Sequence, residues 1–318
     1  MPSIDCERRT RTVSVTSTDP RQDSPAAPET GPAAGAGPAR REGKGGVLNV
    51  FSQSFLVLWA LMAAGPVIWV VISSFRPHAD VVADPFGLPT ELRWENFSNA
   101  WTNADIGRYA VNSLIILSGS LTGTMLLGSM AAYVIARYSF RGNRALYLLF
   151  TGGLMFPVFL ALVPLFFVLN NFGLLNTRQG LIIVYIAYSL PFTVFFLASF
   201  FRSLPGGVQE AAALDGASHT RTFFQIMMPM ARPGLVSIGI FNFLGQWNQF
   251  VLPRVLNVGD PNDAVLPQGL AALMVQQGYE GDWGALYAGV TMSMLPVLVV
   301  YVTFQRQVQS GLTAGALR

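Results

Sequence analysis

The sequence predicts an all-α polytopic membrane protein with six transmembrane helices. Of its 318 residues, 52% are hydrophobic and only 12% are charged, which is far from the composition of an ordinary soluble domain. A membrane-spanning helix needs about 20 consecutive, mainly apolar residues. The runs that reach this length are residues 50–75, 110–137, 145–170, 181–201, 234–252 and 284–304. None of these runs contains Asp, Glu, Lys or His, which supports their assignment as spans.

Residues 1–46 differ in composition from the rest of the chain. They are rich in Pro, Ala, Gly, Ser and Thr and lack aliphatic periodicity, so they cannot bury enough apolar surface to offset the entropy lost on folding. We therefore expect a disordered cytoplasmic tail over 1–46, either regulatory or without a function of its own, and a transmembrane domain over 47–318. The single cysteine, Cys6, excludes an internal disulfide and a Cys-based metal site. We expect neither a metal nor a cofactor in this chain.

The basic residues are distributed unevenly over the predicted loops. If the N-terminus faces the cytoplasm, eleven flank the spans on that side and five lie on the opposite side. Because cytoplasmic loops carry an excess of Lys and Arg, both termini and the loop at about 203–232 are predicted to be cytoplasmic. The cytoplasmic set is Arg40, Arg41, Lys44, Arg137, Arg141, Arg144, Arg202, Arg221, Arg232, Arg306 and Arg318, and the outer set is Arg76, Arg93, Arg108, Arg178 and Arg254.

Two outer loops carry aromatic side chains. In residues 76–109, Leu92, Phe97 and Trp101 are spaced to form one face of an interfacial helix. The loop after the fifth span combines carboxylates with aromatic residues, which is a common way to hold a sugar, but aromatics at this depth also form an interfacial belt or a docking surface for a partner. We favour the belt or the docking surface. The residues concerned are Asp260, Asp263, Tyr279, Glu280, Asp282 and Trp283.

Small and amide side chains occur inside the spans. Ser118, Gly119, Gly123 and Gly128 recur at helical spacing, which predicts close helix packing. Near residue 247 the polar side chains are amides, and an amide in hydrocarbon is costly unless it faces a neighbouring helix or a wet path. Two hypotheses follow: these residues line a route for a sugar, or they brace the interface with a second subunit. The candidates for such a substrate path are Gln246, Trp247 and Asn248.

The absence of certain residue types indicates which sources of energy this membrane protein could use. Carriers coupled to protons or ions place ionisable groups inside the bundle, and the six predicted spans contain none. The only lysine, Lys44, lies in a sequence without the spacing of a phosphate-binding loop, so this chain cannot hydrolyse ATP itself. The only histidines, His78 and His219, are predicted on opposite sides of the membrane, and no catalytic set can be assembled from them. The chain is therefore predicted not to be an enzyme.

The most informative stretch is the polar loop within residues 201–235. Pro205 suits a first helical turn, and the residues up to Leu214 are mostly helix formers. Gly216 can take the left-handed conformation that ends a helix, and Ser218 is then an N-cap for a second one, which Pro229 would close. The local prediction is two short helices joined at a glycine hinge, with a low-relief alanine face on the first. An ordinary amphipathic hairpin is the alternative.

The order of residues in this loop resembles the EAA loop of the permeases of binding-protein-dependent ABC importers. The matching positions are Glu210, Ala211, Ala212, Asp215, Gly216, Ala217, Phe223, Ile226 and Pro229. The resemblance implies a cytoplasmic loop that docks into a cleft on an ATPase subunit, with Glu210 as the main coupling residue and with Phe223 and Ile226 packed into the cleft. Two departures are Met228, where a leucine is usual, and a glycine pair at Gly206, which predicts a late helix start.

Further motifs over 47–318 are similar to the carbohydrate branch of these permeases, and most to the second permease subunit of maltose-type systems. The C-terminal positions Gln305, Arg306, Gly311 and Gly315 resemble the tail that inserts between the ATPase subunits. The segment at Asp282 resembles oligosaccharide and amino-sugar systems. The other matching residues are Asn112, Ser113, Met155, Phe156, Pro157, Pro164, Leu165, Gly173, Leu174, Leu175, Asn176, Thr177, Trp247 and Asn248.

The resemblance implies a type I ABC importer permease fold in a bacterial inner membrane. Its expected partners are a second homologous permease subunit, two ATP-binding subunits, an extracytoplasmic sugar-binding protein and membrane lipid, but no nucleic acid. Together the two permeases would form the sugar path. The alternatives are an ABC permease for a non-sugar solute, such as a polyol phosphate, and an ATP-independent secondary carrier.

Overall fold

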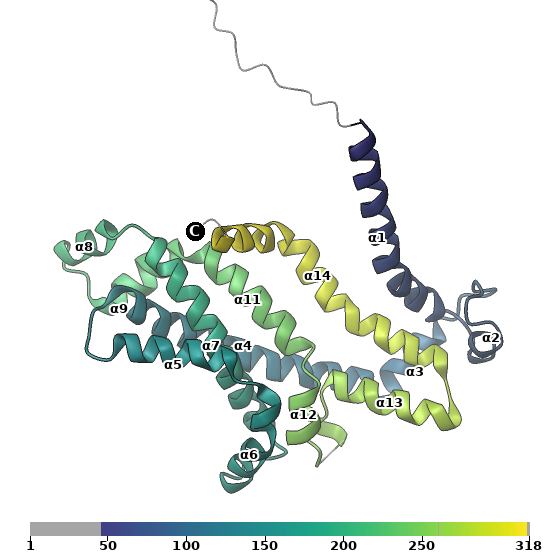
Figure 1. Cartoon of the computed structure of the whole chain (residues 1–318). Helices are drawn as coiled ribbons and strands as arrows, with labels where there is room; N and C mark the ends of the chain where they lie inside the picture. Colours follow the sequence, from purple (N-terminus) through teal and green to yellow (C-terminus); the bar gives the residue numbers. More distant parts are fainter. Residues whose placement is uncertain (1–45, 260, 317–318) are drawn as a thin grey trace, which may run out of the picture. The chain divides into compact units, whose positions relative to one another are not determined.

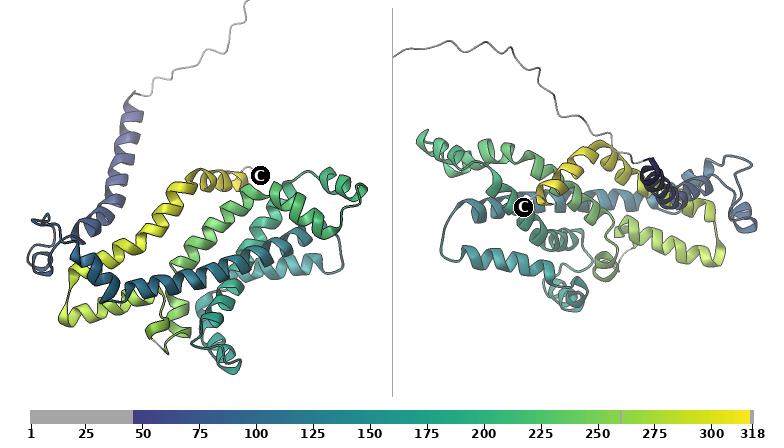
Figure 2. Two further views of the ribbon diagram at one scale, coloured as in Figure 1. Left: turned by 180° about the vertical axis from the view of Figure 1, so that it is seen from behind. Right: turned by 45° about the horizontal axis from the view of Figure 1, so that its top comes forward.

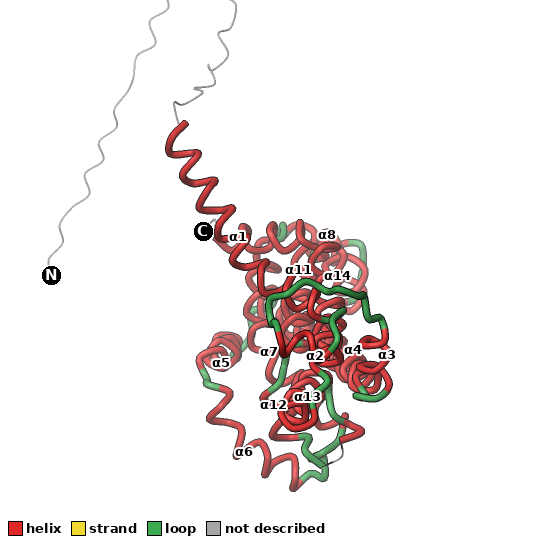
Figure 3. Tube along the Cα trace, turned by 90° about the vertical axis from the view of Figure 1, so that its right-hand side faces the viewer, coloured by secondary structure: helices red, strands yellow, loops and turns green. Residues whose placement is uncertain are grey.

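The computed structural model describes residues 46–259 and 261–316, and every regular element in these residues is a helix (Figure 3). The predicted tail, residues 1–46, lies outside this part except for Gly46, where the first helix begins. Contacts divide the chain into residues 1–55 and 56–318, and the description below concerns the second unit. The helices are α1 (Gly46–Ser73), α2 (His78–Ala83), α3 (Glu95–Thr102), α4 (Ile106–Arg137), α5 (Asn143–Met155), α6 (Val158–Asn171), α7 (Arg178–Ser203), α8 (Gly207–Leu214), α9 (His219–Arg221), η1 (Thr222–Met227), α10 (Met228–Met230), α11 (Arg232–Trp247), α12 (Val251–Leu256), η2 (Pro261–Asp263), α13 (Leu266–Glu280) and α14 (Trp283–Ala316) (Figure 1).

Four helices of the described chain are long and apolar enough to cross a membrane alone. They are Val50–Ser73 of α1, α4, α7 and Trp283–Gln307 of α14. Two bent pairs also qualify, α5 with α6 and the segment His219–Met230 with α11, so the number of spans rises to six if each pair is counted as one. The prediction of an all-α polytopic fold is confirmed, and six spans agree with this range.

The predicted third span, residues 145–170, is not one straight helix. It breaks between α5 and α6, where the chain bends by 105°. Phe156 ends α5 in an extended conformation, with φ −78° and ψ 119°, because the following Pro157 disfavours a helical residue before it. The predicted fifth span, 234–252, is also interrupted: α11 ends at Trp247 and α12 starts at Val251.

The packing of α4 against α7 confirms the close contact predicted from the small residues. A Cβ atom at Gly119 would lie 3.0 Å from Ile182 Cδ1, and one at Gly128 would lie 2.6 Å from Thr193 Cγ2. A side chain at either position would therefore push the two helices apart. α4 and α7 therefore form the central helix pair of the unit.

At the end of the unit that contains α3 and α13, a polar loop is tied to α4 and α7. Arg178, at the start of α7, donates to Asp263 Oδ1 from Nε at 3.0 Å and from Nη2 at 2.6 Å. Asn112 of α4 donates to the carbonyls of Asn262 and Ala264 at 2.7 and 3.0 Å. The Asp263 carboxylate is therefore engaged by its own chain, which counts against the sugar-holding alternative for that residue.

The other predicted features of the outer loops are only partly present. Leu92 precedes α3 and is 61% exposed, whereas Phe97 packs against Phe75 with ring centroids 5.0 Å apart. The predicted single apolar face is wrong because the helix starts only at Glu95, so Leu92 lies outside it, and because Phe97 turns inward while Trp101 is 50% exposed. The side chains of Asp260, Tyr279 and Glu280 lie outside the described part.

Candidate coupling loop and solute cavity

The predicted glycine hinge follows directly from local geometry. α8 ends at Leu214, and Gly216 has φ +72°, in the left-handed region that favours glycine. The amide of Gly216 donates to Ala213 O at 3.1 Å, and that of Ala217 donates to Ala212 O at 3.0 Å. These two bonds form a Schellman motif, which closes the last carbonyls of α8. α8 starts at Gly207, later than Pro205, as the glycine pair predicts.

The second arm of the loop also begins where the sequence predicts. The hydroxyl of Ser218 accepts from the amide of Arg221 at 3.3 Å, and its carbonyl accepts from Thr222 N at 2.8 Å. α9 then continues as the π-helix η1, a rare form that is frequent at functional sites. The segment that ends at Met230 meets α11 at 78°. Figures 1 and 2 show this loop at the opposite end of the unit from α3 and α13.

The matched positions of the loop divide by exposure. The buried pair is Ala212 and Phe223, and the half-buried pair is Ala217 and Ile226. The exposed positions are Glu210, Ala211, Asp215, Gly216 and Pro229.

The expectation that Phe223 inserts into a partner's cleft is not supported by its position. Its side chain is 5% exposed and packs against Tyr133, with ring centroids 5.1 Å apart, in a cluster that includes Phe201. An aromatic ring gains free energy by filling this space in its own chain, because burial removes its apolar surface from water. Phe223 therefore anchors the loop and does not offer a free surface.

Two apolar side chains that were not predicted from the sequence are exposed on the loop, whereas Phe223 is buried. Leu214 is 89% exposed, immediately before the hinge, and Phe224 is 46% exposed on η1. The adjacent phenylalanines indicated that one of the two would point away from the core, because consecutive residues of a helix point in different directions, but not which one. Leu214 could be found only once the orientation of α8 was known.

The base of the loop is held by the end of α4. Arg137 donates from Nη2 to Leu204 O at 2.7 Å, just after α7 ends. The Tyr138 hydroxyl lies 3.0 Å from His219 Nδ1 at the start of the second arm. Both ends of the loop are therefore fixed to one element of the bundle, and a force on the loop would be passed to α4, α7 and α11.

The amide of Gln246 lies inside the bundle, bonded to both neighbouring helices. Its Oε1 accepts from the Ser120 hydroxyl of α4 at 2.8 Å, and its Nε2 donates to the Ser189 hydroxyl of α7 at 2.9 Å. One turn earlier on α11, Asn242 donates from Nδ2 to Thr193 Oγ1 at 2.8 Å. These bonds satisfy both ends of the Gln246 amide and the Nδ2 of Asn242, which would otherwise be costly in an apolar interior.

Trp247 and Asn248 lie in different surroundings from Gln246. Trp247 is buried, stacks on Phe243 with an interplanar angle of 5°, and donates from Nε1 to Ser293 O at 3.2 Å. Asn248 is exposed and donates to Leu244 O of its own helix at 2.9 Å. The prediction of a path beside Trp247 is not supported, because its indole ring faces α14 within the core.

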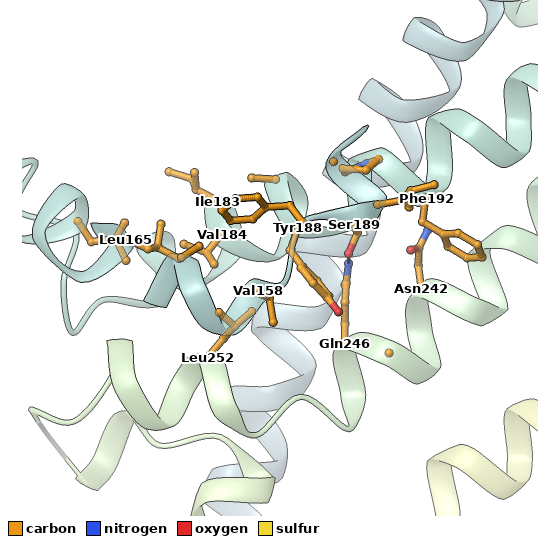
Figure 4. A pocket seen from close by; sticks show the side chains of 18 of the residues that line it. Val158, Leu165, Ile183, Val184, Tyr188, Ser189, Phe192, Asn242, Gln246 and Leu252 are labelled. Atoms are coloured by element: carbon orange, nitrogen blue, oxygen red, sulfur yellow. Dashed lines mark hydrogen bonds between the residues drawn. The ribbon is translucent and has the colours of Figure 1, made fainter. Parts of the chain in front are cut away.

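A large cavity lies elsewhere on the same helix. It has a volume of about 900 Å³ and is bounded by α5, α6, α7, α11 and α12. Phe156, at the bend between α5 and α6, is one of its lining residues, and most of the lining is apolar. Its polar side chains are Tyr188, Ser189, Asn242 and Gln246 (Figure 4). Of the predicted path residues, only Gln246 borders it.

The C-terminal candidates lie on α14, which continues to Ala316. Gln305 and Arg306 are exposed, and Gln305 Nε2 donates to Val302 O at 3.2 Å. Gly311 and Gly315 fall within the same helix.

Comparisons with known proteins agree with this architecture. The family model of the binding-protein-dependent transport system inner membrane component matches residues 124–313. The diacetylchitobiose uptake system permease protein NgcG of Streptomyces coelicolor is 52% identical over 267 residues, with 84% of this chain and 88% of that protein covered.

Two more distant comparisons extend the match. The trehalose/maltose transport system permease protein MalG of Thermococcus litoralis is 31% identical, with 82% of this chain and 94% of that protein covered. A chain from the crystal structure of a bacterial ABC transporter involved in the import of the acidic polysaccharide alginate superimposes with a TM-score of 0.74 at 20% identity, covering 82% of this chain and 96% of the other, and shows the fold. The chain therefore belongs to the family of inner membrane components of binding-protein-dependent transport systems, the permease subunits of ABC transporters.

Proposed function

We propose that this chain is the permease subunit of an ATP-driven sugar importer and forms half of the translocation path. The observation that carries the proposal is the coupling loop, which presents the exposed side chains of Glu210 and Leu214 on a helix that ends in a capped hinge. An exposed apolar side chain on a rigid element, beside a carboxylate, is typical of a surface that binds a protein partner, because binding removes the apolar group from water. The partner is an ATPase subunit, and ATP is hydrolysed there.

In this arrangement the exposed face of α8 makes the contact. Glu210 and Ala211 lie on it, Leu214 adds apolar area, and Phe224 extends the surface onto η1. Asp215 and Gly216 shape the hinge, and Phe223 holds it against the bundle. When two ATPase subunits close on ATP, they move the loop as a rigid body, and the bonds from Arg137 and Tyr138 transmit the motion to α4.

The arginines support a cytoplasmic location for the coupling loop. Arg137, Arg144 and Arg202 lie at or near the end of the bundle that carries this loop, and Arg221 lies in the loop itself (Figure 1). By the positive-inside rule, this distribution supports a cytoplasmic loop and cytoplasmic termini. The exposed side chains of Gln305 and Arg306 on α14 then face the ATPase subunits as well.

The complex contains a second homologous permease, two ATPase subunits and an extracytoplasmic binding protein. The sugar is an N-acetylated amino-sugar disaccharide, because the relative with 52% identity is named for the uptake of diacetylchitobiose. The cavity of about 900 Å³ is within the range of about 300–1,000 Å³ typical of small-molecule sites.

Uptake of labelled N,N′-diacetylchitobiose by cells that express the complete complex tests this proposal. We expect uptake that requires this chain and stops when the ATPase subunit cannot hydrolyse ATP. Uptake that continues without ATP hydrolysis would identify a secondary carrier. ATP-dependent uptake of a labelled polyol phosphate, with none of the disaccharide, would identify a permease for a non-sugar solute.

A further inference from the structure

The cavity beside α7 and α11 carries a polar strip in an otherwise apolar wall. Tyr188 and Ser189 are consecutive on α7, and Asn242 and Gln246 are one turn apart on α11 (Figure 4). Phe192 and Phe241 form part of the same wall and make an edge contact, with ring centroids 6.2 Å apart. Aromatic rings next to amide and hydroxyl groups are the chemistry that holds a sugar, because the rings cover its C–H face and the polar groups bond its substituents.

The polar groups of this strip differ in their remaining hydrogen-bonding capacity. Both ends of the Gln246 amide are engaged, by Ser120 and by Ser189. Asn242 uses only its Nδ2, toward Thr193 Oγ1 and Met125 Sδ, and within the described residues its Oδ1 accepts no hydrogen bond. The Tyr188 hydroxyl likewise has no partner among the described residues, and its side chain is 48% exposed. Asn242 Oδ1 and the Tyr188 hydroxyl are therefore available to a ligand.

We propose that Asn242 and Tyr188 contact the sugar directly during its passage. This inference rests on the proposed function and names the residues of this chain that hold its substrate. Asn242 Oδ1 accepts from the acetamido N–H of a 2-acetamido sugar, the Tyr188 hydroxyl bonds a ring hydroxyl or the acetyl carbonyl, and Phe192 and Phe241 cover the acetyl methyl group. A lipid tail in the same cavity has no donor for Asn242.

The bond between Asn242 and Thr193 has a second consequence, because it also joins α7 to α11. Loss of that bond could impair transport for structural reasons alone. Thr193→Val removes the same interhelical bond with little change in shape and leaves Asn242 Oδ1 in place. It is the matched control for Asn242→Leu. Tyr188→Phe needs no such control, since it removes only a hydroxyl without a partner in the described chain.

The experiment uses the complete complex in proteoliposomes, with the binding protein at saturating concentration. It measures the uptake rate of labelled N,N′-diacetylchitobiose, the ATPase rate and their ratio. We expect Asn242→Leu and Tyr188→Phe each to lower the sugar transported per ATP by about three- to tenfold, the effect of one lost hydrogen bond. Thr193→Val should lower this ratio less than Asn242→Leu does, because it leaves Asn242 Oδ1 available to the sugar.

Three results would contradict the inference. Equal losses in Asn242→Leu and Thr193→Val would show that Asn242 only joins the two helices. Unchanged ratios in Asn242→Leu and Tyr188→Phe would show that the cavity is not on the path. If the unaltered complex does not transport the disaccharide, the proposed substrate is wrong, and the assignment of these residues to an acetamido sugar fails with it.

Discussion

Substitution of Gly216 is the most direct test of the coupling loop. Gly216 has φ +72°, and a Cβ atom built on it would meet nothing within 4 Å. Gly216→Ala therefore causes no clash, and its cost is that of placing an L-residue in the left-handed region, roughly 1–2 kcal/mol. That energy lowers the population of the native hinge about 5- to 30-fold relative to its alternatives. Gly216→Asn should cost less, since asparagine enters this region more readily.

Gly216→Pro has a larger effect. The proline ring holds φ near −65°, which the hinge cannot accept. It also removes the amide that donates to Ala213 O at 3.1 Å, a bond worth about 0.5–1.5 kcal/mol. The second arm, with Phe223, would then leave its place against Tyr133. The expected loss of coupling increases from Gly216→Asn through Gly216→Ala to Gly216→Pro.

The measurement is sugar transported per ATP hydrolysed, together with recovery of the ATPase subunits in a pull-down on this chain. All three variants should reach the membrane in normal amounts, because Gly216 is exposed and lies outside the predicted spans. Gly216→Pro should lose both coupling and ATPase association, whereas Gly216→Asn should keep both. A Gly216→Pro complex with a normal ratio of sugar to ATP would refute the role of the hinge.

The remaining predictions concern the surface and the orientation of the same loop. Glu210→Lys reverses an exposed charge that has no ion pair among the described residues, so it should lower sugar transport per ATP while the ATPase subunits stay bound; a normal ratio would count against Glu210 as the coupling residue. Leu214→Asp should weaken ATPase association at least tenfold, because burying a Leu side chain contributes about 1.5–3 kcal/mol, whereas Leu214→Met should not. With the single native cysteine replaced, Val258→Cys should react with an impermeant reagent in intact cells and Ser218→Cys should not. The reverse pattern would overturn the orientation.

Features that depend on neighbouring residues along the chain were predictable from the sequence. The hinge is one of these: a left-handed glycine and a serine N-cap satisfy backbone groups within a few residues, so no distant contact is needed to form them. The apolar runs are another, since a backbone in hydrocarbon must satisfy its own hydrogen bonds and therefore becomes helical. The break at Phe156 was also a local effect, of Pro157, although the length of the apolar run concealed it.

Features that depend on which side chains meet were decided by the tertiary structure. The sequence could not tell that Phe223 would fill the space beside Tyr133 while Phe224 stayed exposed, because the choice depends on how η1 approaches the end of α4.

The cavity shows the same division between sequence and structure. The sequence indicated that the amides near Trp247 must find partners, and Gln246 did so on two helices. It did not single out Asn242. The Nδ2 of this residue is bonded to Thr193 of α7, and its Oδ1 has no partner in the described chain. The residue types and the helix periodicity determined that polar groups would be buried between helices. The approach of α7 to α11 decided which of those groups remained for a solute, since hydrogen-bonding capacity left over after folding depends on contacts between residues far apart in the chain.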